Sequence, residues 1–526
     1  MTRRNFLVTG VAGITTTLTG SVLATARAPR ELRLGLSSPA TSADPHYQAV
    51  SANVSLSQHI FDALVHVDAT GRYVPGLATS WRATDAYTWE IKLRPGVRFH
   101  DGSLLTMEDV LHSLRRPSTI IDSPGPFTTF SKQFVRLQPL DDSTLEIKTR
   151  EPYGGLPGDL SSLFIVSKKA SERAQPADFD AGRAAVGTGP FKLRRFTKGE
   201  SVRLERHDAY WGGRPDWEAV TLTYLTDDKQ RTAALLSDEV DAIEAVPSAD
   251  TAKLREQRGL SLIQRTSWRT IFFHLEQFTD RSPWIFDANG QPMTTSPLKD
   301  RRVRRALSLA IDREAVVKGI MGGQALPAAQ LVAPGIVGYN ETLKPDPYDP
   351  AQARKLLADA GFPNGFSLTL HAPNNRYIND EKIAGAVAHF WGGVGVRTKV
   401  ETFPAADYFA RARRGEFSVA MLGYGSMGAD FALRALLGTP DSNKGWGTWN
   451  WAKYTNSRLD ATIHAALQST DPSKRQLLAA AAMDMAMHDH AVLPLHHQLA
   501  TWCMRKGISY AGRVDEFTFA HHFKIA

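Results

Sequence analysis

The second half of the chain alternates helices with short apolar strands, and this alternation restricts the fold more than any other feature. Apolar residues recur at helical spacing in four segments: 303–319, 350–361, 380–394 and 405–413. Three segments that follow the last three of these helices have the length and composition of strands: 366–371, 396–401 and 417–422. Such an alternation favours an open α/β sheet, because the connecting helices cover its faces.

The first half is richer in strands. Apolar and polar residues alternate with a period of two in five segments: 31–36, 87–93, 143–149, 201–206 and 219–225. A helix is predicted at 52–64. A chain of 526 residues with 42% hydrophobic and 22% charged residues is long enough for about two to four soluble domains. We predict an α/β fold class with mixed sheets.

Four arginines lie close together in DRRVRRALSLAID (300–312), which raises the question of phosphate binding. On a helix, one apolar stripe is formed by Val303, Ala306, Leu307, Ala310 and Ile311. Arg301, Arg302 and Arg305 lie off this stripe, and Arg304 borders it. No aromatic residues for base stacking are interleaved with the arginines. We predict a packed helix with a solvated basic flank, and no nucleic acid as a partner.

Residues 1–28 have the pattern of an export signal: a charged start, a modestly apolar middle and an end of small residues. Arg3-Arg4-Asn5-Phe6-Leu7 resembles the twin-arginine motif, although Val8 replaces the usual lysine. General secretion is the alternative route. We expect cleavage after Ala28 or Ala26 and a periplasmic mature protein. No later segment reaches the ~18 consecutive apolar residues of a membrane span.

The mature chain is only mildly basic and holds one cysteine. Loss of residues 1–28 removes three arginines and no acid, which lowers the formal net charge from +8 to +5. This charge argues against nucleic acid as a partner. Cys503 is the single cysteine, so no disulfide can form within the chain.

The segment LATSWRATDAYTWEIKLRPGVRFHDGSLLTMEDVLHSL (77–114) has a clear physical interpretation. It predicts a strand, an Asp-Gly turn and a helix for which Thr106 and Asp109 form a capping box. The segment also resembles the family 5 extracellular solute-binding proteins. Three further segments share this resemblance: VGTGPFKLRRF with HDAYWGGRP, PLKDRRVRRALSLAIDREAVV, and YDPAQARKLLADAGFPNGF.

The resemblance implies the receptor of an ABC importer, with three domains arranged in two lobes around a hinge. Domain I would comprise residues 29–64, 187–275 and 491–526. Domain II would be an insertion at 65–186, and domain III would cover 276–490. The lobes are expected to close on a ligand.

The ligand would then be buried between the lobes, and HAPNNRYINDEK (371–382) is one expected wall. It follows a strand and begins a helix, where ligands of open α/β sheets are found. Arg376, with Tyr377 beside it, could hold a substrate carboxylate through two hydrogen bonds. The alternative is a surface arginine that pairs with Asp380.

A second expected wall is LGYGSMGADFALRALL (422–437), which includes Tyr424, Ser426, Met427 and Asp430. Peptide-binding members of the family carry an aspartate for the peptide ammonium at the position of Met427. A buried ammonium without a carboxylate partner would be costly. Either another acid replaces it, with Asp430 one possibility, or the ligand has no free amino terminus. Asp430 could instead be a helix N-cap.

Two further segments contribute possible ligand contacts. KGWGTWNWAKY (444–454) offers flat apolar faces and an amide, with Trp446, Trp449 and Asn450 as the expected contacts. The alternative for this segment is internal packing. His46 and Tyr47 align with a family segment that approaches the ligand.

The sequence gives no sign of a metal site, a cofactor or a catalytic motif. The histidines cluster as His488 with His490, His496 with His497, and His521 with His522, without Cys or Glu at metal-ligand spacing. An exported hydrolase is the outside alternative, but neither G-x-S-x-G nor H-E-x-x-H occurs. We therefore expect a monomeric receptor that delivers a peptide or peptide-like solute to a permease and ATPase. The alternative cargo is a non-peptide solute such as an opine, an oligosaccharide or a metal chelate.

Overall fold

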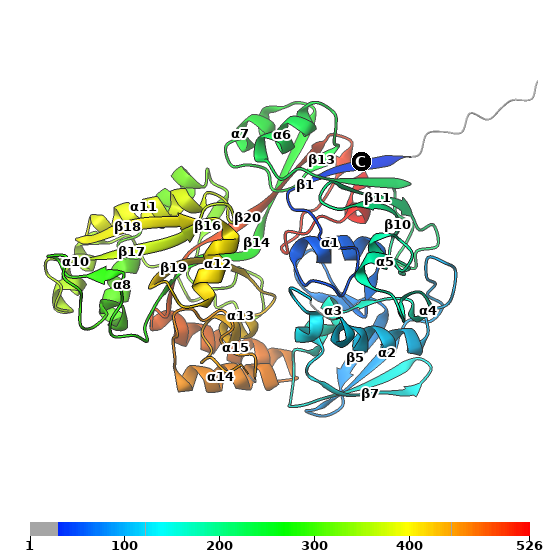
Figure 1. The fold of residues 1–526 in the computed structure, drawn as a ribbon, viewed down its shortest axis with the longest axis horizontal. Helices are drawn as coiled ribbons and strands as arrows, with labels where there is room; N and C mark the ends of the chain where they lie inside the picture. The colour runs from blue at the N-terminus through cyan, green and yellow to red at the C-terminus, as the bar shows by residue number, and fades with distance from the viewer. Residues whose placement is uncertain (1–29, 121–122, 443) are drawn as a thin grey trace, which may run out of the picture.

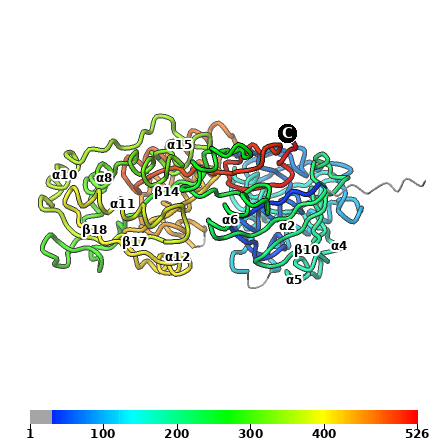
Figure 2. The backbone as a smooth tube through the Cα atoms, turned by 90° about the horizontal axis from the view of Figure 1, so that it is seen from above, coloured from blue at the N-terminus to red at the C-terminus, as the bar shows by residue number. Residues whose placement is uncertain are grey.

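A computed structural model describes residues 30–120, 123–442 and 444–526, so the export signal predicted at 1–28 lies outside the described residues. Two lobes lie side by side (Figure 1). We call the part between strands β14 (Leu260–Leu275) and β20 (Val492–Arg505) the second lobe, and the rest the first lobe. Figure 2 shows the blue and cyan chain confined to the first lobe and the yellow chain to the second.

One mixed sheet of twelve strands runs through both lobes. Its strands are, in spatial order, β10 (Phe191–Thr197), β11 (Ser201–Arg206), β12 (Ala219–Tyr224), β1 (Glu31–Leu36), β13 (Ala242–Ile243), β20 (Val492–Arg505), β14 (Leu260–Leu275), β19 (Val419–Gly425), β17 (Phe366–Pro373) and β15 (Ile285–Phe286), with β16 (Ala325–Pro327) on β20 and β18 (Val396–Phe403) on β17. The predicted α/β class with mixed sheets is confirmed.

β14 and β20 form the antiparallel ribbon that joins the lobes (Figure 1). At one end Leu260 pairs with Arg505, and at the other His274 pairs with Val492. The register shifts between Thr266 and Thr270, so the regular ladder is interrupted near the middle of the ribbon.

The second lobe has the predicted βα alternation. β17 pairs in parallel with both β18 and β19. The helices of this lobe are α8 (Arg301–Leu309), α9 (Arg313–Ala315), α10 (Pro350–Asp359), α11 (Asp380–Gly392), α12 (Ala405–Arg413), α13 (Ala429–Leu436), α14 (Ser457–Gln468) and α15 (Pro472–His488). The predicted helix 303–319 is wrong as a single helix. α8 ends at Leu309, and the Asp312 side chain caps a new helix by accepting from the Ala315 N–H.

The arginine run lies on α8 as predicted. Arg301, Arg302 and Arg305 are exposed. Arg304 is buried, and its guanidinium donates to the carbonyl oxygens of Leu298, Lys299, Asp489 and His490. The cluster therefore belongs to the packing of the second lobe.

The first lobe contains a separate antiparallel sheet in the order β5 (Ala78–Ala83), β6 (Thr88–Leu93), β8 (Thr144–Thr149) and β7 (Phe134–Asp141). Its helices are α1 (Ser51–Ile60), α2 (Met107–Arg115), α3 (Leu156–Ser162), α4 (Lys168–Ser171), α5 (Pro176–Asp180), α6 (Asp228–Leu236) and α7 (Thr251–Glu256). The capping box of Thr106 and Asp109 is confirmed at the start of α2. The helix predicted at 52–64 ends earlier, at Ile60, whose carbonyl accepts from the Gly189 N–H.

Candidate binding site between the lobes

The lobes touch where a glycine turn of the first lobe meets two helices of the second. The Gly154 N–H donates to the Leu467 carbonyl at the end of α14 over 2.7 Å. The Arg475 guanidinium, on α15, donates to the Gly154 carbonyl over 3.0 Å. Phe431, on α13, packs against hydrophobic clusters of both lobes. Residues of both lobes therefore form one continuous interface here.

Asp430 is buried in this interface and is already paired. Arg475 Nε donates to Asp430 Oδ2 over 2.6 Å, and the Phe431 N–H donates to Oδ1 over 2.9 Å. The N-cap of α13 is Gly428, so the N-cap alternative for Asp430 is wrong and this acid lies in the first helical turn. An ammonium at Asp430 would have to compete with Arg475.

The other residues of the second predicted wall lie at the end of β19 and directly after it. Tyr424 and Met427 are half-buried, whereas Ser426 is buried. Ser426 Oγ donates to the Gly428 carbonyl over 2.8 Å, which fixes the turn into α13. Tyr424 and Met427 thus keep free surface next to the lobe interface.

The first predicted wall lies beside this turn. The buried Tyr377 Oη donates to the Gly423 carbonyl over 3.2 Å. A Cβ at Gly423 would lie 2.6 Å from the Tyr377 ring, so this position needs a glycine for the two walls to pack. These contacts place Tyr377 against the strand that leads to Tyr424.

Arg376 is exposed, and its guanidinium has no hydrogen bond or ion pair within the described part of the chain. The predicted pairing with Asp380 involves the backbone only, because the N–H groups of Arg376 and Tyr377 donate to Asp380 Oδ2 over 2.9 and 3.0 Å. The guanidinium carbon of Arg376 lies 5.2 Å from the centre of the Tyr377 ring. Its charged donors remain available to a solute.

In the tryptophan segment (444–454), some of the predicted contact residues keep exposed surface and others are buried. Trp446 and Trp449 are half-buried against the core of the second lobe. Asn450 is buried, and its amide donates to the carbonyls of Gly438 and Tyr454 and accepts from the Tyr454 N–H. Both amide donors are used within the described chain, so Asn450 is not left free to donate to a ligand as predicted.

His46 is also an internal residue. It is fully buried, with Nε2 at 2.8 Å from the Phe164 carbonyl and Nδ1 at 3.2 Å from the Arg116 guanidinium. Burial lowers its pKa to about 3, so the imidazole is neutral at physiological pH. No surface of His46 is available to a solute, so the predicted ligand contact of this residue is wrong. The neighbouring Tyr47 is half-buried.

Three charged residues at the interface had no recognisable sequence pattern. Asp159, on α3, is buried, and burial raises its pKa to about 7. Lys132 precedes β7, and burial followed by the charge of Arg434 lowers its pKa. Arg434 lies on α13, and its buried Nε has no acceptor among the described residues. They come from three separate elements in two lobes, so no local spacing could have identified them.

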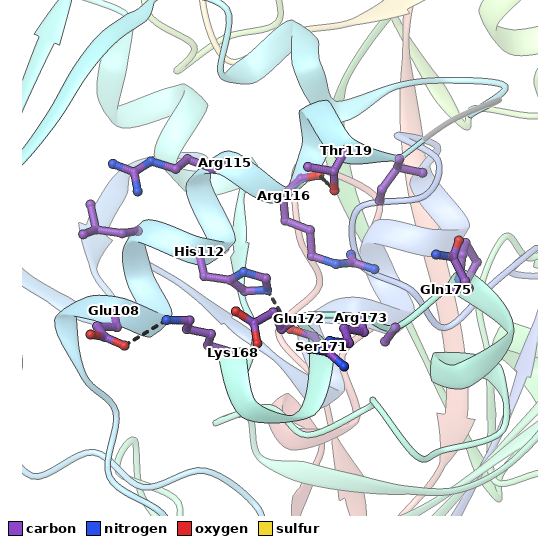
Figure 3. Close-up of a pocket in the computed structure, with 14 residues that line it drawn as sticks. Glu108, His112, Arg115, Arg116, Thr119, Lys168, Ser171, Glu172, Arg173 and Gln175 are labelled. Atoms are coloured by element: carbon purple, nitrogen blue, oxygen red, sulfur yellow. Dashed lines mark hydrogen bonds and ion pairs between the residues drawn. The ribbon is translucent and has the colours of Figure 1, made fainter.

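A cavity of about 580 Å³ lies in the first lobe, away from this interface (Figure 3). Residues of two segments, 108–120 and 168–176, line it, and none belongs to the second lobe. Several of its polar side chains are paired internally: Lys168 contacts Glu108 at 3.0 Å, and His112 Nε2 lies 2.9 Å from Ser171 Oγ.

Two kinds of feature are absent from the described residues. Within the described ranges, no group of three or more His, Cys, Asp or Glu is arranged to hold a metal ion. In the same ranges, no helix has the length and apolar character that crossing a bilayer requires.

Two lobes, a shared β-ribbon and polar groups gathered where the lobes meet define a two-lobe solute-binding protein. The model of the bacterial extracellular solute-binding proteins, family 5, matches residues 72–444, and the chain belongs to this family.

Individual relatives agree with this assignment. The dipeptide-binding protein of Escherichia coli strain K12 is 27% identical, with 86% of each chain covered. The glutathione-binding protein GsiB of Salmonella typhimurium is 27% identical, with 89% of each chain covered. HbpA2 from Haemophilus parasuis has a similar fold, with a TM-score of 0.79, 23% identity and coverage of 94% of this chain and 100% of that one.

Proposed function

We propose that this chain is the solute receptor of an ABC importer and that its solute is a peptide or a peptide-like molecule. Family membership supports the receptor role. Relatives named for dipeptide and glutathione binding support a peptide-like solute. The observation that carries the proposal is Arg376, an exposed and unpaired guanidinium at the carboxyl end of β17.

In the proposed complex, Arg376 binds a carboxylate of the solute through two charged hydrogen bonds. Tyr377 holds the loop in place, and the free surfaces of Tyr424 and Met427 lie along the solute. Trp446, Trp449 and Tyr47 add apolar faces. The solute is bound and released without chemical change.

The remaining assignments complete the proposal. Residues 1–28 direct export, with a twin-arginine motif and cleavage near Ala28, and the mature monomer works in the periplasm with a permease and an ATPase. Domain I comprises 29–64, 187–275 and 491–526, domain II is 65–186, and domain III is 276–490. The hinge lies in the β14–β20 ribbon, where the register shift interrupts the regular ladder.

Calorimetric titration with a library of di- and tripeptides tests this function. Arg376→Met should raise the Kd of the best peptide about 10- to 100-fold, because it removes a charged hydrogen-bonded pair. Arg413→Met is the matched control, because Arg413 is an exposed arginine at the end of α12. Absence of binding by the wild-type chain, or an unchanged Kd for Arg376→Met, would contradict the proposal.

A second candidate cargo is a solute without a free amino terminus, such as an opine, an oligosaccharide or a metal chelate. Met427 favours it, because this residue stands where a carboxylate would otherwise meet the ammonium of a peptide. The peptide titration separates the two candidates. A receptor for such a solute would not bind any library peptide that has a free α-amino group.

A further inference from the structure

The β14–β20 ribbon is interrupted by a bulge at residues 267–269. Thr266 pairs with Leu499 and Thr270 pairs with His497, so three residues of β14 lie opposite a single residue of β20. A bulge of this kind interrupts the ladder and bends the strand that carries it. The backbone groups that leave the ladder here need partners from elsewhere in the chain.

The bulge also marks the point at which β14 enters the second lobe. Residues 269–275 pair with β19 of that lobe, beginning with Arg269 opposite Gly425. Residues 260–266, on the other side of the bulge, pair only with β20 among the described strands. A rotation of the second lobe about the bulge would therefore carry Arg269 with it.

The C-terminal segment 511–516, which we call the strap, passes over β14 at this point. Arg265 Nε donates to the Ala511 carbonyl over 2.7 Å. Gly512 has a φ of +70°, and a Cβ at this residue would lie 2.7 Å from Cγ of Arg265. A glycine is therefore needed here, both for the backbone conformation and for the close approach of the strap to β14.

The strap supplies partners to all three residues of the bulge. The Trp268 N–H donates to the Val514 carbonyl over 2.9 Å. Glu516 accepts from Ser267 Oγ over 2.6 Å and from Arg269 Nη2 over 2.8 Å. Arg269 Nε lies 3.2 Å from each oxygen of the same carboxylate. Glu516 and Arg269 thus form an ion pair with several hydrogen bonds.

The other side of the strap is fixed to the first lobe. The Arg513 guanidinium donates to the Asp515 carboxylate over 2.9 Å and to the carbonyls of Val67 and Asp68 over 2.8 and 3.2 Å. The side chains of Arg513 and Asp515 are both 2% exposed. Breaking a buried, hydrogen-bonded ion pair is strongly destabilising, so the strap stays with the first lobe when the lobes move.

The conformation of Glu516 indicates that its surroundings hold it in place. Its φ is +67°, in the left-handed region that residues other than glycine seldom adopt. Strained residues of this kind persist only where their contacts fix them, and they gather at clamps and switch regions. Burial acts to raise the pKa of Glu516, but the charge and hydrogen bonds of Arg269 outweigh it and keep this pKa below its usual value. Glu516 is therefore ionised at neutral pH.

We infer that the strap holds the two lobes in contact through the ion pair between Glu516 and Arg269. The first lobe positions Glu516 and the second lobe positions Arg269, so rotation of the second lobe away from the first pulls the pair apart. This inference rests on the proposed function, in which the lobes move about the β14–β20 ribbon, and it adds a regulation of that site. The C-terminal strap sets how often an empty receptor has its lobes in contact.

Electron–electron double resonance measures the separation of the lobes without any solute. Spin labels on Asp142→Cys and Arg413→Cys report from one exposed position in each lobe, and the native Cys503 is buried. Glu516→Gln should shift the distances of the empty chain toward longer values. The ratio of touching to separated lobes should fall about tenfold, the effect of losing one charged hydrogen-bonded pair that water screens in part.

Arg269→Met removes the same pair from the other side and should give the same shift. The double variant should differ little from either single variant, because both substitutions remove one interaction. In a calorimetric titration, each variant should raise the Kd of the tightest library peptide by up to about tenfold. Glu90→Gln is the matched control, since it breaks the 3.0 Å ion pair with Arg82 in the separate sheet of the first lobe and should change neither readout.

Thermal unfolding midpoints show whether each variant is folded. If Glu516→Gln does not fold, Arg269→Lys takes its place, because lysine keeps the charge but loses the two-pronged contact, and it should give a smaller shift in the same direction. Wild-type distances together with a wild-type Kd in the folded variants, or additive effects in the double variant, would overturn the role of the strap. If peptides bind and the strap variants behave as wild type, the receptor function stands without the strap. If the distances shift but no peptide binds, the strap stands and the peptide receptor is wrong.

Discussion

Gly154→Ala tests whether contact between the lobes controls solute binding. A Cβ at residue 154 would lie 1.9 Å from the Ser469 carbonyl oxygen, which belongs to the opposite lobe. One of these atoms is a Cβ, which the backbone fixes, and the other is a backbone oxygen. Rotation about a side-chain bond therefore cannot relieve the clash. The lobes would have to separate at this point.

Separation removes two hydrogen bonds between the lobes. The bond from the Gly154 N–H to the Leu467 carbonyl is neutral, and the bond from Arg475 to the Gly154 carbonyl involves a charged donor. Net contributions of about 1 kcal/mol and about 1.5–3 kcal/mol sum to about 2.5–4 kcal/mol. The population of touching lobes should fall by about two to three orders of magnitude, and the apparent Kd of the best peptide should rise by up to the same factor.

The assay combines calorimetry with small-angle scattering. In the presence of peptide, Gly154→Ala should show a larger radius of gyration than wild type and a higher Kd, with a nearly unchanged unfolding midpoint because each lobe has its own core. Gly259→Ala is the control, since a Cβ at that exposed position meets no atom within 4 Å. A wild-type radius of gyration together with a wild-type Kd would refute the reasoning.

Two further predictions concern acid stability and solute choice. Burial lowers the pKa of His274 to about 3. The neutral imidazole therefore makes its full contribution to the free energy of unfolding above the unfolded-state pKa near 6.5, and this contribution is lost as the pH falls from there toward 3. At pH 5 this protonation lowers the free energy of unfolding by about 2 kcal/mol. Denaturant titrations should therefore show that the free energy of unfolding drops by about 2 kcal/mol less between pH 7 and pH 5 in His274→Leu than in the wild type. Identical drops in the two proteins would contradict this prediction. Met427→Asp should lower the Kd of α-linked peptides about tenfold if the space beside Tyr424 accepts a peptide amino terminus, and calorimetry showing no gain would favour a solute without one.

Local patterns predicted most of the secondary structure of this chain. β17, β18 and β19 were placed correctly because short apolar strands between amphipathic helices have few alternatives. The helix predicted through 303–319 failed for a reason that periodicity does not detect. The Asp312 side chain offered a cap to the backbone and started a second helix.

The binding site was less predictable, because tertiary contacts decide which polar groups remain free. Asn450 and Arg376 are both polar residues in loops. The amide of Asn450 is hydrogen-bonded to backbone carbonyls, whereas the guanidinium of Arg376 is exposed. The resemblance predicts a ligand contact for His46, but its Nδ1 lies 3.2 Å from the Arg116 guanidinium inside the first lobe. No sequence pattern identifies Asp159, because the cations that affect its pKa belong to distant segments of the chain.

Hydrogen–deuterium exchange of the mature chain with its tightest peptide tests the central claim most directly, because it reports on both lobes at once. If the solute lies between the lobes, amides near Asp159 in the first lobe and near Tyr424 in the second should both gain protection, and the peptide should be recovered with its mass unchanged. Protection confined to one lobe, or a peptide recovered in altered form, would contradict the account.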